Sequence, residues 1–84
     1  MSRIYLEVRV PGAAKTYEFT ADSVMTVKNV KTQFIRQISA VEDREIFADA
    51  GQVLFCSVRL QGLLQDQEIL GEVGVTSGDT IILL

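Results

Sequence analysis

The chain has 84 residues, enough for one small domain with a single hydrophobic core, and we expect residues 1–84 to form that domain. It contains no histidine, which excludes Ser-His and Cys-His catalytic pairs and histidine-based zinc sites. The formal net charge of −3 argues against nonspecific binding to nucleic acid. No apolar run approaches the roughly 20 residues needed to cross a membrane, so we expect a cytoplasmic protein without membrane insertion.

The first twenty residues alternate between apolar and polar side chains, as a β-hairpin does. From residue 4 to residue 10 every even position is apolar, while Tyr5 and Arg9 are among the odd positions. Pro11-Gly12 predicts a turn, and the alternation resumes over residues 15–20. The pattern therefore predicts two antiparallel strands, each with one face in the core.

The period changes after Thr26, which is a natural N-cap residue for an α-helix. The apolar positions that follow are spaced by 3, 4, 1 and 3 residues, which is typical of one face of a helix. They are Val27, Val30, Phe34, Ile35 and Ile38, with Lys28, Lys31 and Arg36 on the opposite face. We predict that the helix ends near Ile38 or Ser39. The apolar side chains of residues 41–51 fit either an extension of this helix or a second short one.

The second half of the chain predicts short strands separated by turns. We expect a strand at residues 53–58 that continues through residues 59–64 with a kink at Gly62. One helical turn then ends at Gly71 or Gly74. A tight turn at Ser77-Gly78 leads into a last strand at residues 79–84. The chain thus ends on four apolar residues, which fit a strand inside a sheet better than a frayed tail.

The hairpin and the later strands can bury the apolar face of the one amphipathic helix only if they form a single sheet that wraps around it. The predicted fold class is α+β, with a β-grasp architecture in which a mixed sheet of four to five strands surrounds the helix. A crossover joins the two halves of the chain, so the first and last strands lie side by side and parallel. In this fold the last strand is central, with Ile81 and Leu83 facing the helix.

Three stretches resemble the ubiquitin-like superfamily: the N-terminal hairpin, the helix entry MTVKNVKTQFIRQI and the close LLQDQEILGEVGVTSGDTIILL. Together they cover nearly the whole chain apart from residues 39–51. The resemblance implies the β-grasp fold and a protein that docks other proteins on the open face of its sheet.

Ubiquitin-like modifiers and sulfur carriers extend beyond the last strand into a flexible tail that ends in Gly-Gly and is adenylated. This chain ends at Leu83-Leu84 instead, and it is most similar to the tailless YukD/EsaB family of bacterial type VII secretion. The resemblance implies a cytosolic accessory or regulatory component of a type VII (ESX-like) secretion system that is not conjugated. The alternative is a β-grasp carrier or modifier activated at a C-terminus beyond this chain. A longer precursor with Gly-Gly, encoded beside an adenylating enzyme, would favour that alternative.

No catalytic, cofactor or metal site emerges from the sequence, so we expect a protein that is not an enzyme. Gly71, Gly74 and Gly78 lack the strand and helix that flank a phosphate-binding loop. The carboxylates between residues 42 and 49 lack the spacing of a calcium-binding loop and predict a solvated face. Cys56 lies in an apolar run and is expected to be a small buried side chain.

The remaining candidate is the sheet face that the helix leaves open. Strand alternation predicts that Leu54, Cys56 and Val58 face the helix. Phe55 and Arg59 then face the open side. The predicted protein-binding residues are Tyr5, Arg9, Phe55, Arg59, Ile82 and Leu84, with the two arginines at the rim. An open sheet face is usually polar, so an apolar one indicates a docking surface for a partner protein. The alternative covers are the segment after the helix and a second copy of the chain.

Overall fold

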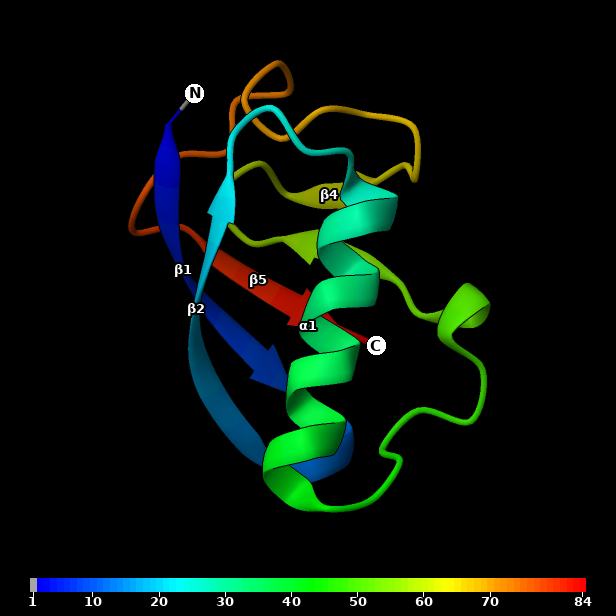
Figure 1. The fold of residues 1–84 in the computed structure, drawn as a ribbon. Helices are drawn as coiled ribbons and strands as arrows, with labels where there is room; N and C mark the ends of the chain where they lie inside the picture. Colours follow the sequence, from blue (N-terminus) through cyan, green and yellow to red (C-terminus); the bar gives the residue numbers. More distant parts are fainter. Residues whose placement is uncertain (1) are drawn as a thin grey trace.

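The computed structural model describes residues 2–84 as one α-helix packed on a five-stranded sheet (Figure 1). The strands are β1 (Arg3–Val10), β2 (Lys15–Asp22), β3 (Phe55–Ser57), β4 (Gly62–Leu64) and β5 (Thr80–Leu83), and the helix is α1 (Val27–Glu42). Two short 3-10 helices, η1 (Pro11–Ala13) and η2 (Ala50–Gln52), lie in the connections. Within residues 2–84, no helix is long and apolar enough to cross a membrane.

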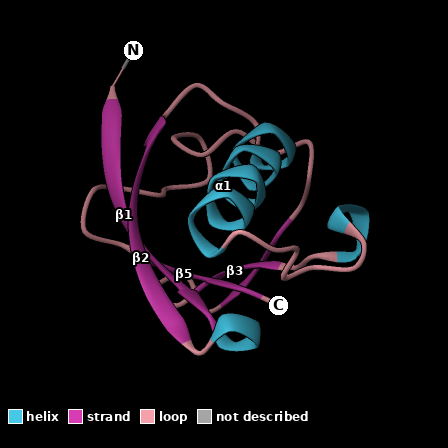
Figure 2. Ribbon diagram, turned by 60° about the horizontal axis from the view of Figure 1, so that its bottom comes forward, coloured by secondary structure: helices cyan, strands magenta, loops and turns pink. Residues whose placement is uncertain are grey.

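The sheet is mixed, and its central strand is β5. The strand order is β2-β1-β5-β3-β4, with β1 and β5 parallel and every other neighbouring pair antiparallel. The sheet curves around α1, which lies against one face only, as Figure 2 shows. This arrangement confirms the predicted β-grasp fold, and it confirms the parallel pairing of the first and last strands.

Thr26 caps the N-terminus of α1, as its position in the sequence predicts. Its side chain accepts a hydrogen bond from the Asn29 backbone N–H at 3.3 Å. At the other end, Asp43 adopts a left-handed conformation with φ of 54°, and its backbone N–H donates to the Ser39 carbonyl. These caps set the length of the helix.

Helix α1 is about one turn longer than predicted, because its last turn is bound to β2. The Glu42 carboxylate accepts hydrogen bonds from Lys15 Nζ at 2.9 Å and from Tyr17 Oη at 2.8 Å. The apolar periodicity stops at Ile38, since Val41 lies on the outer side of the helix and is 68% exposed. A hydrophobic pattern does not detect a turn that polar contacts hold.

Phe34 lies at the centre of the core and is fully buried. Its ring lies between Phe19 of β2 and Phe55 of β3, with centroid separations of 4.9 and 6.5 Å. Phe19 is half-buried and packs against the core. The other core residues predicted from the pattern are confirmed as buried: Ile4, Leu6, Val30, Ile38, Ile81 and Leu83.

Lys31 is buried, although the helical pattern places it on the polar face of α1. Its ammonium donates hydrogen bonds to the Val53 carbonyl at 2.9 Å and to the Asp66 carboxylate at 2.8 Å. These two acceptors replace the water that the ammonium loses on burial. Lys31 therefore ties the helix to the segments that precede β3 and follow β4.

Residues 43–49 form an irregular connection, so only the first residues of the segment 41–51 extend the helix. Ile46 and Phe47 are half-buried and pack against the core. Ile46 also approaches the β1–β2 turn, where a Cβ atom on Gly12 would lie 3.5 Å from its side chain. The segment thus closes one end of the core.

The connection between β3 and β4 departs from its predicted form. β3 and β4 have three residues each, and a turn at residues 58–61 separates them, with Gln61 at φ of 59°. The chain therefore reverses before Gly62 and does not kink at it. The predicted helical turn does end at Gly74, which has φ of 97°, and the Val75 N–H donates to the Leu70 carbonyl at 3.0 Å.

Phe34→Ala should destabilise the fold by about 3–5 kcal/mol, because it removes the ring that fills the core between α1 and the sheet. Urea unfolding followed by circular dichroism measures this loss. Val41→Ala, at an exposed position of the same helix, is the control and should change the free energy of unfolding by less than about 0.5 kcal/mol. Equal stabilities of the two variants would contradict the assignment of the helix face.

Candidate functional site

The open face of the sheet carries a row of neighbouring side chains across four strands. Ile82 of β5 pairs with Arg9 of β1 on one side and with Cys56 of β3 on the other. Cys56 in turn pairs with Leu63 of β4. Paired residues on adjacent strands point to the same face, so these four side chains form one continuous strip.

Two more leucines extend this strip into an apolar patch. Leu84 follows β5, and its backbone N–H donates to the Leu54 carbonyl at 3.1 Å, which places the two residues side by side. The exposed fractions of Leu54, Leu63 and Leu84 are 46%, 51% and 57%. We define the apolar patch as Leu54, Cys56, Leu63, Ile82 and Leu84.

Phe55 is not on this face, and the prediction that placed it there is wrong. Its side chain is 1% exposed and packs against Phe34. Ser57 is buried as well, and its hydroxyl accepts a hydrogen bond from the Leu60 N–H at 3.2 Å. The register of this strand is therefore shifted by one residue from the prediction, so Leu54 and Cys56 point outward.

The shift has a physical reason in the sequence itself. Residues 53–58 include no charged side chain, so the alternation there does not show which face meets solvent. The largest side chain, Phe55, lies under the helix, where it buries the most apolar area. Leu63 was missed for a related reason, because β4 was predicted as a continuation of the preceding strand. The two successive leucines after Gly62 are the available signal.

Tyr5, Ile82 and Leu84 do lie on the open face, but they do not all meet. Ile82 is half-buried and Leu84 exposed, both within the apolar patch. Tyr5 is 62% exposed and lies farther along β1, where its carbonyl accepts a hydrogen bond from the Gly78 N–H at 2.8 Å. The structure therefore brings the C-terminal residues together with Arg9 and leaves Tyr5 at the other end of the face.

Arg59 lies in the turn between β3 and β4, where it forms a bidentate ion pair. Its Nε and Nη2 atoms donate to the Asp79 carboxylate at 2.8 and 2.9 Å, and Nη2 also donates to the Gly74 carbonyl. Asp79 is buried and accepts a further bond from the Thr76 N–H at 3.0 Å. The Arg59 guanidinium beside it holds the pKa of the Asp79 carboxyl below its usual value. A role of Arg59 in partner binding stays a prediction.

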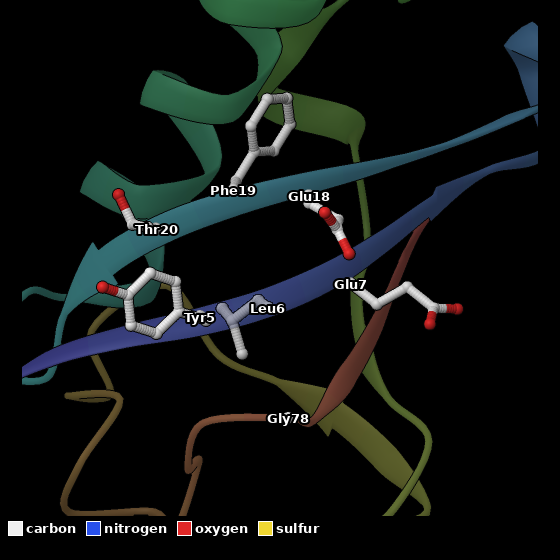
Figure 3. A pocket seen from close by; sticks show the side chains of 7 residues that line it. All are labelled: Tyr5, Leu6, Glu7, Glu18, Phe19, Thr20 and Gly78. Carbon is white, nitrogen blue, oxygen red and sulfur yellow. The ribbon is translucent and has the colours of Figure 1, made fainter.

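A hollow of about 460 Å³ lies at the hairpin end of the open face (Figure 3). Tyr5 pairs with Thr20 across the hairpin, and Glu7 pairs with Glu18. Figure 3 shows the Tyr5 ring beside Thr20, with the Glu7 carboxylate turned away from that ring. We define the hairpin hollow by the lining residues that face it: Tyr5, Glu7, Glu18, Thr20 and Gly78.

The described part of the chain, residues 2–84, contains no group of three or more His, Cys, Asp and Glu side chains arranged to hold a metal ion. Cys56 is half-buried, and burial raises the pKa of its thiol, which disfavours the reactive thiolate form. What the open face offers is apolar contact at the end with the apolar patch and charge at the end with the hairpin hollow.

Comparison with known proteins places the fold. No family model and no curated protein matches the sequence. Among solved structures, the EccD5 ubiquitin-like domain from Mycobacterium xenopi is 13% identical with a TM-score of 0.78, over 100% of this chain and 94% of that one. The UBL domain of Plasmodium falciparum Dsk2 is 20% identical with a TM-score of 0.75, over 98% and 96%. A ubiquitin-like domain from Arabidopsis thaliana is 21% identical with a TM-score of 0.72, over 100% and 78%. At these identities the likeness establishes a ubiquitin-like fold alone.

Acid should weaken the fold as Asp79 becomes protonated. Its pKa is lowered from 3.8, so the charged carboxylate stabilises the folded state above that pH, and the stabilisation is lost as the pH falls through the folded-state pKa. In urea unfolding between about pH 5 and pH 2, Asp79→Asn should lose less stability than the wild type. An Asp79→Asn slope equal to that of the wild type would contradict the ion pair.

Proposed function

We propose that this protein is a non-enzymatic ubiquitin-like module that binds a partner protein through its apolar patch. The observation that carries this proposal is the exposure of Leu54, Leu63 and Leu84 on the sheet face opposite α1. Contiguous exposed apolar surface on a small protein marks contact sites more often than chance. The open sheet face is the place where the fold can offer such a surface, because α1 occupies the other side.

The patch has the properties of the centre of an interface. Complete burial of a large apolar side chain stabilises by about 1.5–3 kcal/mol, so a half-exposed leucine would gain roughly half of that when a partner covers it. The three leucines together thus offer a few kcal/mol before the costs of association are subtracted. Arg9 lies beside Ile82 at one edge, where it would orient the partner more than it would strengthen binding.

The patch is also held in place before any partner arrives. Its residues come from or adjoin β3, β4 and β5, which are hydrogen-bonded neighbours in the sheet. The Arg59–Asp79 ion pair and the Lys31 contacts tie the turns around these strands to the rest of the fold. A rigid surface loses little conformational entropy on binding, which favours affinity for a given contact area.

The role we propose is that of a cytosolic accessory or regulatory component of a type VII (ESX-like) secretion system. Support comes from the sequence resemblance to the YukD/EsaB family. The mycobacterial EccD5 ubiquitin-like domain, which has the same fold with a TM-score of 0.78, adds a bacterial example of this shape. On this proposal the partner is a cytosolic part of the secretion apparatus.

The double variant Ile82→Ser with Leu63→Ser should lose partner binding at least tenfold, because it replaces two apolar contacts of the patch by hydroxyls. Immobilised wild-type protein captures binding proteins from a native lysate, and calorimetry then gives the affinity of each captured protein for both forms. Val41→Ser, on the outer side of α1, is the matched control and should bind as the wild type does. Both variants are used only if thermal unfolding shows them folded. Unchanged affinity of the double variant would contradict the patch as the docking surface.

Deletion of the gene in the source organism should reduce the export of type VII substrates, because the apparatus would lose an accessory component. Immunoblots of culture supernatant against cell pellet measure that export. Wild-type protein supplied in trans should restore it, whereas the folded Ile82→Ser, Leu63→Ser form should not. Normal export in the deletion strain would overturn the secretion role and leave the binding role to the capture experiment.

A further inference from the structure

The hairpin hollow contains an unbalanced pair of carboxylates. Glu7 of β1 and Glu18 of β2 are directly paired across the hairpin, and like charges in this position repel each other. Arg9 Nε binds the Glu7 carboxylate at 3.0 Å. Among residues 2–84 no ion pair involves Glu18. Two carboxylates and one guanidinium therefore leave one net negative charge on this part of the open face.

The other basic residues of the hairpin do not compensate Glu18. Lys15 lies at the start of β2, and its ammonium binds Glu42 of the helix at 2.9 Å. Arg3 pairs in register with Asp22 at the far end of the hairpin. Residues 2–84 thus provide an acceptor for a cation in the hairpin hollow and no cation that pairs with Glu18.

The aromatic ring of Tyr5 is a second feature of the hollow that attracts a cation. The ring is 62% exposed and lies next to Thr20, two residue pairs along the hairpin from Glu18 and on the same face. A guanidinium stacks on an aromatic ring while its N–H groups donate to a carboxylate, and the two attractions act together. The hollow of about 460 Å³ between these groups has room for an arginine side chain.

We infer that the partner protein presents an arginine that enters the hairpin hollow and contacts Tyr5 and Glu18 while its apolar side chains cover the apolar patch. This inference rests on the proposed function, since it gives the chemistry of the partner that docks there. Glu18 lies on β2 and Ile82 of the apolar patch on β5, two strand spacings apart, so the arginine lies about 10 Å from the nearest apolar contacts. Charge complementarity thereby selects a partner surface that is apolar with a basic edge.

Two matched synthetic peptides test this inference. In one, an arginine stands about three residues from a pair of alternate leucines, because an extended chain rises about 3.3 Å per residue. In the other, citrulline replaces that arginine and keeps its shape without its charge. Both are titrated into isotope-labelled protein, and nuclear magnetic resonance follows the backbone amides of the hollow and of the patch.

The arginine peptide should bind about fivefold more tightly, given the usual strength of an exposed ion pair and a cation–π contact. It should shift the amides of Tyr5, Glu18 and Thr20, and the citrulline peptide should not. Glu18→Gln should abolish the difference between the peptides. Glu72→Gln, at an exposed carboxylate outside the hollow, is the matched control and should preserve that difference.

Equal affinities of the two peptides, shifts confined to other residues, or equal effects of the two glutamine variants would overturn the inference. Absence of binding by both peptides would overturn it too. Self-association of the wild type that Glu18→Gln abolishes would identify a second copy as the occupant and would also overturn it. None of these results touches the capture experiment with Ile82→Ser and Leu63→Ser, which judges the proposed function separately.

Discussion

A single helix closes the core of this sheet, and the Phe34 ring is the contact on which both halves of the chain meet. Phe19 reaches it from the first hairpin and Phe55 from beyond the crossover, so three rings join segments that are distant in sequence. Because α1 covers only one face, the same packing that makes the core leaves the other face to solvent. The candidate docking surface is thus a direct result of how the core is built.

The parts of the fold that the sequence predicts well are those where charged side chains mark the solvent side. Glu7 and Arg9 do so in β1, and the register of that strand is as expected. Residues 53–58 include no charged side chain, and the sequence pattern places their side chains on the wrong faces of the sheet, one residue out of register. The end of α1 was also misplaced, because its last turn depends on Glu42 and its partners in β2. Contacts between residues so far apart leave no local pattern.

The residues of the candidate site also divide into those that the sequence predicts and those that only the structure reveals. Ile82 and Leu84 follow from the alternation of the last strand, whereas Leu54 follows only once Phe55 is known to be buried. Arg59 looks like a free rim charge in the sequence, and its ion pair with Asp79 joins residues that are 20 positions apart. The two ends of the open face, one apolar and one acidic, become neighbours only through the parallel pairing of β1 with β5.

The place of β5 in the sheet also bears on how the protein folds during synthesis. β5 is the last of the five strands along the chain, yet it lies between β1 and β3 and joins the two halves of the sheet. Until residues 80–83 leave the ribosome, the first hairpin and β3 have no strand between them, and the apolar face of α1 has an incomplete cover. Folding of residues 2–84 must therefore wait for β5, and the long-range pairing that completes the sheet costs loop-closure entropy and slows the final step.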